Sequence, residues 1–283
     1  MEMKKYVSAL LWGLFLVILI TACSNDDDSV SIEETPLSEE VADEDAGNNE
    51  RVDRTPNLQG LGESARDLLS DENFTRVVVE IVSVRGFAPS AQSVENLVDF
   101  IEERTFKPDG VRVVMREIAP PDNEDDEYSV REIAEIEGQV RTQFNNGNEI
   151  AVFMFFADAP SVNDSDTSVT LGTAYRNTSL VFYERTIRRL GTNNNLGISL
   201  TTVETAVMHH EYAHIMGLVD VGTPLLSDHL DEENGGHCNV PGCLMRASLE
   251  FGTADQMMEM MAGNRVPLLD PLCIADLRGN GGR

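Results

Sequence analysis

Three residues in the segment 210–214, which reads HEYAH, have the types and the spacing of a hydrolytic zinc site. On a helix, His210 and His214 would project from one face, one turn apart. Their imidazole nitrogens could then bind one zinc ion at about 2.0–2.1 Å. Glu211 could accept a proton from a zinc-bound water and return it to the leaving amine of a peptide bond. The segment therefore predicts zinc-assisted hydrolysis, with Glu211 as general base and then general acid.

A simpler interpretation of this segment is two core histidines whose nitrogens are satisfied by hydrogen bonds. Three of the chain's five histidines lie in the stretch 208–214, MHHEYAH, and this concentration favours the metal site. We expect His209 to be structural, because it points away from the face that carries the other two.

A third zinc ligand must come from the chain beyond this helix. Asp220 completes the pattern HExxHxxGxxD, while His229 and His237 lie further on. Zinc accepts both imidazole and carboxylate, so the donor chemistry leaves all three open. Gly217, three residues after His214, would allow the chain to turn back sharply, or would simply end the helix.

The segment 237–245, HCNVPGCLM, resembles the HCxxxxCxM block of the archaemetzincins, which are metzincin zinc peptidases. The resemblance implies that His237 is the third zinc ligand and that Met245 forms the Met-turn below the metal. Residues 218–236 are an insertion relative to that family's spacing. From about residue 61 onward the chain is also similar to the Bacteroidetes lipoproteins called membrane metalloproteases. We therefore rank His237 first, Asp220 second and His229 third.

Three cysteines follow the N-terminal region: Cys238, Cys243 and Cys273. The same resemblance implies that the first two begin a second, structural zinc site, which archaemetzincins complete with a CxxC pair. Here that pair reads CIAD at 273–276, so Asp276 would replace the last sulfur, and zinc accepts carboxylate oxygen. The alternative is a Cys238–Cys243 disulfide with a free Cys273, which an oxidising compartment would permit.

The first 22 residues are organised like a secretory signal, with Lys4 and Lys5, an apolar run and small residues before Cys23. The run is shorter than the about 20 residues of a membrane-spanning helix. Residues 20–23 resemble a bacterial lipobox, which implies cleavage before Cys23 and a lipid on that residue. The stretch SNDDD at 24–28 resembles an export tag of Bacteroidetes surface lipoproteins. We expect a lipid anchor in the bacterial cell envelope, at the outer membrane or the cell surface, and an acidic disordered linker over 23–57.

The chain of 283 residues carries a formal net charge of −28. Nucleic-acid binding needs a basic surface, so this balance argues against it. The expected partners are a protein or peptide substrate and the membrane that holds the lipid anchor.

The elements before the HEYAH segment alternate between strand and helix. Apolar runs predict strands at 76–85, 111–118 and 150–157, helices at 64–69, 93–103 and 129–144, and weaker strands at 172–175 and 179–183. This alternation predicts an α/β (α+β) fold with a mixed, mostly parallel sheet and an active-site helix at 200–217. We expect two metzincin-like lobes: residues 58–217, and a loop-rich C-terminal subdomain of residues 218–283 with helices at 254–261 and near 274. By resemblance, the strand 172–175 is the edge along which substrate lies.

Two functions fit these features. The first is a membrane-anchored zinc endopeptidase. The second is a non-catalytic surface lipoprotein whose zinc only stabilises a binding domain. Glu211 favours the first, because a purely structural zinc site needs no general base.

Overall fold

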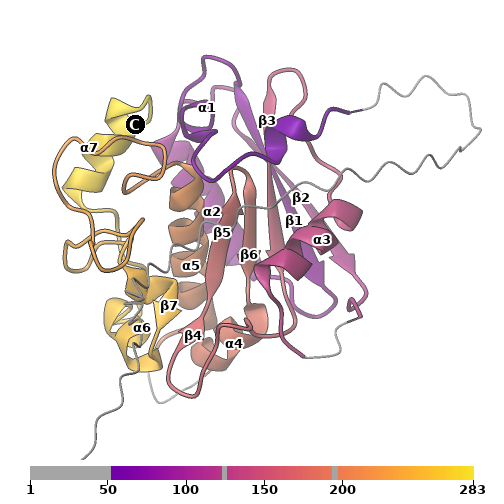
Figure 1. Cartoon of the computed structure of the whole chain (residues 1–283), viewed down its shortest axis with the longest axis vertical. Coiled ribbons are helices and arrows are strands. Elements are labelled where there is room, and N and C mark those ends of the chain that lie inside the picture. Colours follow the sequence, from indigo (N-terminus) through magenta and orange to yellow (C-terminus); the bar gives the residue numbers. More distant parts are fainter. Residues whose placement is uncertain (1–51, 123–125, 193–196) are drawn as a thin grey trace, which may run out of the picture. The chain divides into compact units, whose positions relative to one another are not determined.

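A five-stranded sheet forms the centre of the folded part of the chain (Figure 1). The computed structural model describes residues 52–122, 126–192 and 197–283, all within the unit Glu50–Arg283. The sheet order is β2-β1-β3-β6-β5, in which the first four strands are parallel and β5 is antiparallel to β6. This mixed, mostly parallel sheet confirms the expected fold class. The strands are β1 (Arg76–Val84), β2 (Val111–Ile118), β3 (Glu149–Phe156), β5 (Gly172–Arg176) and β6 (Ser179–Phe182).

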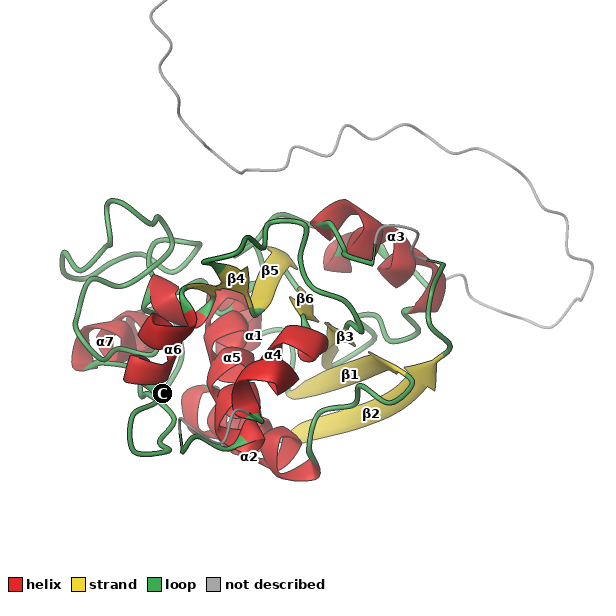
Figure 2. Cartoon of the chain, turned by 90° about the horizontal axis from the view of Figure 1, so that it is seen from below, coloured by secondary structure: helices red, strands yellow, loops and turns green. Residues whose placement is uncertain are grey.

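Helices cover both faces of the sheet, as Figure 2 shows. The larger layer contains α2 (Ala91–Arg104), α4 (Glu184–Gly191) and α5 (Leu200–Ile215), together with the short α1 (Ala65–Leu69), while α3 (Val130–Val140) covers the opposite face. Alternate residues of β3 reach the two layers: Met154 packs on the α2–α5 side, and Phe153 and Phe155 pack with Ile133 of α3. Both faces are therefore buried, which explains the continuous apolar runs of the central strands.

The chain beyond α5 is mostly irregular and carries two further helices, α6 (Ala254–Met260) and α7 (Pro271–Gly279). Thr253 and Gln256 form a reciprocal capping box at the start of α6, and Asp270 caps α7. A two-residue strand, β7 (Phe251–Gly252), pairs with β4 (Val169–Thr170), and neither strand was expected from the sequence. This pairing joins the C-terminal segment to the chain that leads into β5. The expected division into lobes at residue 217 stays a prediction.

The folded part begins before the expected end of the linker at residue 57. A 3-10 helix, Thr55–Asn57, precedes that boundary, and Asn57 is buried. The Asn57 amide donates to the Ala151 carbonyl, and its side-chain oxygen accepts from the Asn145 backbone N–H. Asn57 is thus held by β3 and the loop before it, which polar composition alone does not reveal, and the expected extent of the linker stays a prediction.

Two local elements also differ from expectation. α3 ends at Val140 instead of 144, because Arg141 adopts extended backbone and its guanidinium is buried 2.7 Å from Glu137. The helix α4 was not expected, since its sequence, ERTIRRLG, is mostly charged. Only one side of α4 is buried, and Ile187 and Leu190 carry its apolar contact with the core.

Within the described ranges, no helix combines the length and the apolar character needed to cross a bilayer. The signal segment 1–22, Cys23, the SNDDD stretch and most of the linker lie outside the described residues. The lipid anchor therefore stays a prediction.

The buried Glu184 of α4 couples folding to pH. Burial, together with the neighbouring Glu204, raises the pKa of Glu184 to about 8 despite the hydrogen bond from Arg188. Between pH 4.5 and about 8 the unfolded chain releases this proton while the folded chain keeps it. Stability that is present at low pH is therefore lost as pH rises, at up to about 1.4 kcal/mol per pH unit.

We expect Glu184→Gln to remove this part of the pH dependence. The neutral amide needs no proton, so the variant should gain stability relative to the wild type from pH 5 to 8.5. Urea unfolding at several pH values measures the effect, with Glu135→Gln on the exposed face of α3 as the control. Parallel stability curves for the wild type and Glu184→Gln would contradict the assignment.

Candidate active site and metal centres

The helix α5 carries the HEYAH segment between the sheet and the C-terminal part of the chain. Ser199 caps its first turn, and His210, Glu211 and His214 are all buried. His209 lies on another face, where its Nε2 is 3.0 Å from the Asn96 carbonyl and its ring stacks on Phe100. His209 thus packs against α2 and away from the other two histidines, as the sequence predicts.

A sharp turn follows α5 at Gly217, which has a φ of +77°. A Cβ at this position would lie 2.6 Å from the Thr223 nitrogen and 2.7 Å from the Ala65 side chain, so a side chain has no space. The Thr223 backbone N–H donates to the Gly217 carbonyl, and the Thr223 hydroxyl donates to the Met216 carbonyl. The turn sends the chain through residues 218–236 and back to His237 beside α5.

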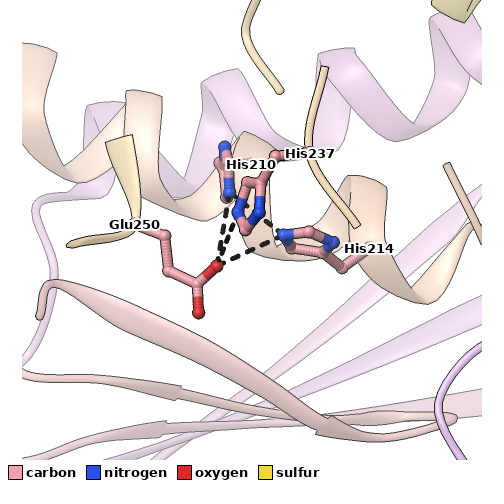
Figure 3. A group of neighbouring side chains, drawn as sticks. All are labelled: His210, His214, His237 and Glu250. Atoms are coloured by element: carbon pink, nitrogen blue, oxygen red, sulfur yellow. Dashed lines mark hydrogen bonds and ion pairs between the residues drawn. The ribbon is translucent and has the colours of Figure 1, made fainter. Parts of the chain in front are cut away.

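Three imidazoles meet at one point beside α5 (Figure 3). The Nε2 atoms of His210 and His214 are 3.0 Å apart, and the His237 ring centroid lies 5.3 Å from that of His210 and 5.0 Å from that of His214. The structure thus brings the first-ranked third ligand to the two helix histidines. Asp220, the second-ranked candidate, is exposed in the left-handed backbone region with φ 67° and does not join this group.

Hydrogen bonds behind two of the three rings, those of His210 and His237, orient them for metal binding. His210 Nδ1 lies 2.7 Å from the Leu244 carbonyl, and His237 Nδ1 lies 3.0 Å from the Gly235 carbonyl. When each Nδ1 donates its proton to a carbonyl, the Nε2 lone pair is left facing the common centre. Burial also lowers the pKa of His210, and it lowers that of His214 to about 4, so both rings are neutral near pH 7. The neutral Nε2 atoms of His210 and His214, turned toward one another, are donors that fit a cation, while the hydrogen bond with Glu250 raises the pKa of His237.

Glu250 belongs to the same group, and sequence reasoning did not find it. Its carboxylate and the three histidines offer donor atoms that all lie within 4.8 Å of one another. The residue comes just before β7, in a segment without regular periodicity. No spacing motif marks it, so only the tertiary structure reveals its position.

Glu211 lies beside the three imidazoles but outside the donor group. Both of its carboxylate oxygens are buried and have no hydrogen-bond partner among the described residues. Burial raises the pKa of Glu211 well above the usual range, and the charge of Glu250 adds to this effect, while the nearby Ala174 backbone N–H partly opposes it. A Cβ at Gly172 would be 2.7 Å from Glu211 Cγ, so the glycine at the start of β5 makes room for this carboxylate. An unpaired buried carboxylate is costly, which fits a site that awaits a cation or a substrate.

Met245, the expected Met-turn residue, is fully buried in the core, and its carbonyl accepts from the Cys238 backbone N–H at 2.7 Å. The preceding residue, Leu244, supplies the carbonyl that orients His210. The turn that contains Met245 therefore positions one imidazole through its backbone.

A second group of donors lies between the C-terminal loops and α7. Cys238, Cys243 and Cys273 are free and buried, and Cys243 Sγ lies 3.7 Å from Cys273 Sγ. His229 Nδ1 approaches two of the sulfurs, at 3.3 Å from Cys238 and 3.9 Å from Cys273. Hydrogen bonds from Cys243 and Cys273 lower the pKa of the Cys238 thiol, which favours a thiolate. Asp270 also belongs to this group: its donor atom lies within 4.8 Å of those of His229, Cys238 and Cys273, and its carboxylate accepts from the Cys238 thiol at 3.3 Å.

Two residues lie elsewhere than the sequence suggests. His229, the third-ranked candidate for the first site, lies among the cysteines instead. Asp276, expected as the fourth ligand beside the cysteines, contacts the far nitrogen of His229 at 2.7 Å. The nearer nitrogen of His229 thereby faces the sulfurs, in an arrangement typical of zinc-bound histidine with a supporting carboxylate. Three sulfurs and one imidazole are a common donor set for structural zinc.

Comparison with solved structures gives a likeness of fold. No family model matches the chain. No curated protein matches it either. The fold is similar to that of an archaemetzincin. That crystal structure, of archaemetzincin from Methanopyrus kandleri, has 15% sequence identity and a TM-score of 0.48, and the match covers 73% of this chain and 96% of that chain.

Proposed function

We propose that the chain is a zinc-dependent endopeptidase that acts on protein or peptide substrates. The observation that carries this proposal is the convergence of His210, His214 and His237 beside the unpaired, buried carboxylate of Glu211. A zinc ion held by the three Nε2 atoms would supply Lewis acidity to a water and to the scissile carbonyl. The non-catalytic alternative leaves the buried Glu211 without a role.

Glu211 has the position of a proton carrier in this proposal. It follows His210 directly on α5, and its oxygens have no other partner in the described part of the chain. A raised pKa suits a carboxylate that takes a proton from water and then donates it to the leaving amine. The residue therefore holds and moves a proton, and it binds no metal itself.

The strand β5 is the proposed platform for the substrate backbone. It is the last strand in the order β2-β1-β3-β6-β5, and within the described residues its outer edge pairs with no further strand of that sheet. An extended peptide could add to this edge through backbone hydrogen bonds. Gly172 at its start touches Glu211, so the edge leads directly to the proton carrier.

The proposal includes attachment to the bacterial cell envelope through a lipid on Cys23. Its support is the lipobox-like sequence and the acidic linker, which would hold the enzyme away from the outer membrane or at the cell surface. The test of the peptidase itself is cleavage of a casein-like substrate by the wild type and by Glu211→Gln.

We also propose a second, structural zinc ion, held by Cys238, Cys243, Cys273 and His229. Cys273→Ser should lower the metal content from two zinc ions per chain to one and lower the melting temperature. The reason is that a closed structural site contributes its binding free energy to folding. Metal analysis after dialysis and a thermal melt measure both effects. One zinc in the wild type, with a single reactive thiol among the three after unfolding, would instead support the disulfide alternative.

A further inference from the structure

The carboxylate of Glu250 stands at a fourth corner around the point where the three imidazoles meet (Figure 3). Its Oε2 lies 2.8 Å from His237 Nε2, 3.5 Å from His214 Nε2 and 3.8 Å from His210 Nε2. In a tetrahedral zinc shell with bonds of about 2.0–2.1 Å, neighbouring donors are about 3.3–3.4 Å apart. The three distances bracket this separation. Glu250 therefore occupies the corner that a hydrolytic zinc site keeps for water or substrate.

We propose that Glu250 is a fourth protein ligand that closes the metal site in the resting enzyme. This inference rests on the proposed function, because only a hydrolytic site needs the position that Glu250 fills. A shell closed by three imidazoles and a carboxylate would hold the ion tightly but leave no place for a substrate. The enzyme in this arrangement is latent, and activity requires Glu250 to leave.

The side chains of the site are also shielded from solvent. The side chains of His210 and His214 are 0% and 6% exposed, and that of Glu250 is 15% exposed. Glu211 is fully buried behind Gly172 of β5. A peptide laid along the β5 edge could not reach Glu211 or the imidazoles here. Some part of the chain must therefore move before a peptide bond is cleaved.

The segment that carries Glu250 has few ties to the rest of the fold. We call residues 250–252 the gate segment; it contains Glu250 and β7, and it follows the 3-10 helix Ala247–Leu249, which is anchored in the core by the fully buried Leu249. It is attached by the two-residue pairing of β7 with β4 and by a hydrogen bond from the Leu171 backbone N–H to the Glu250 carbonyl, 2.7 Å long. Elements with so few backbone bonds open at low free-energy cost compared with core strands.

The gate segment is attached beside the strand to which a substrate would bind, so its release and substrate binding are connected. Leu171 lies between β4 and β5, so the gate segment is fastened directly beside the edge to which a substrate strand would add. Phe251, next to Glu250, packs edge-on against His237 and is 37% exposed. Release of β7 from β4 would draw Glu250 out of the shell and open the approach to β5 in one movement.

The experiment compares full-length wild type with Glu250→Gln, which keeps the shape of the side chain but removes the charged donor. Glu259→Gln, at an exposed glutamate on α6, is the matched control. Zinc affinity is measured by competition with a chelator. The cobalt-substituted proteins are then titrated with acetohydroxamate, and their visible spectra are recorded.

We expect Glu250→Gln to weaken zinc binding by at least about 10-fold, because loss of even an outer partner of a ligand costs 10- to 100-fold. Acetohydroxamate should change the cobalt spectrum of Glu250→Gln at concentrations that leave the wild type and Glu259→Gln unchanged. Casein-like substrate should be cleaved faster by Glu250→Gln than by the wild type at saturating zinc.

Equal zinc affinity and equal cobalt spectra in Glu250→Gln and the wild type would overturn the inference while leaving the peptidase proposal standing. An altered metal shell in Glu250→Gln, without cleavage by any of the three proteins, would support Glu250 as a ligand and count against the peptidase. The two proposals therefore fail in distinguishable ways.

Discussion

Glu211→Gln should lower peptide cleavage by about 10²- to 10⁴-fold, the range that a positioned acid–base group contributes, and leave the zinc content unchanged. The reason lies in the geometry of the site. Glu211 is not among the donors that surround the common centre, but it is buried next to them without a partner in the described residues. The amide of Gln fits the same space against Gly172 and cannot take up a proton from water.

Glu211→Gln should raise the stability of the metal-free protein, although it lowers the rate of cleavage. Because burial raises the pKa of Glu211, the folded chain binds this proton more tightly than the unfolded chain. The contribution of this proton to stability is present at low pH and is lost as pH rises. At neutral pH the ionisable carboxyl therefore lowers the free energy of unfolding relative to a neutral side chain. Glu211→Gln should therefore unfold at a higher temperature than the metal-free wild type at pH 7 to 8.

The matched control for this variant is Glu204→Gln, seven residues earlier on α5. Glu204 is also buried, but it accepts hydrogen bonds from Ser90 and Ser93 and lies away from the imidazoles. That variant should retain zinc and cleavage. Equal cleavage rates for the wild type and Glu211→Gln would remove Glu211 from the reaction and leave the non-catalytic lipoprotein as the better account.

The sequence predicts the parts of the site that depend on local spacing. His210, Glu211 and His214 share a helix, so a four-residue interval is enough to place them. The third imidazole depended on a resemblance, because residues 218–236 separate it from α5 and no periodicity spans that loop. Once the turn at Gly217 has formed, His237 returns to α5 and Asp220 points to solvent.

The parts that local reasoning misplaced depend on contacts between distant segments. His229, and not Asp276, faces the sulfurs, because a family pattern lists donor types but does not say which donor the loop brings nearest to them. Glu250 lies in a segment without a recognisable motif, and its position follows from the two-residue pairing of β7 with β4. The main strands, in contrast, were predicted to within a few residues, since both faces of the sheet are buried.

His237→Ala should weaken zinc binding at the first site more than any other single change among the candidate third ligands. It removes one of three converging Nε2 atoms and leaves His210, His214 and the Glu250 carboxylate. Two imidazoles and one glutamate can still hold zinc in other hydrolytic sites, so the ion should be bound more weakly instead of being lost entirely. The loss in affinity should exceed about 10- to 100-fold, the effect of removing an outer partner.

Asp220→Ala and His229→Ala separate the remaining candidates. Asp220 is exposed, so its replacement should change neither zinc affinity nor cleavage. His229→Ala should leave the first zinc in place and release the second, because His229 faces Cys238 and Cys273. Competition with a chelator, followed by metal analysis, measures the zinc affinity and zinc content of these two variants and of His237→Ala. Loss of catalytic zinc in Asp220→Ala alone would mean that residues 218–236 follow a different path.

The double variant His237→Ala/Glu250→Gln distinguishes a Glu250 that binds zinc from one that only accepts a hydrogen bond. If both residues ligate one ion, each single change leaves three donors, and the double change leaves only His210 and His214. Two donors from one helix hold zinc weakly, so the double variant should lose more affinity than the product of the two single effects. Residues that share one ligand shell are expected to be non-additive in this way. If Glu250 only accepts a hydrogen bond from His237, the double variant should bind zinc no more weakly than His237→Ala alone.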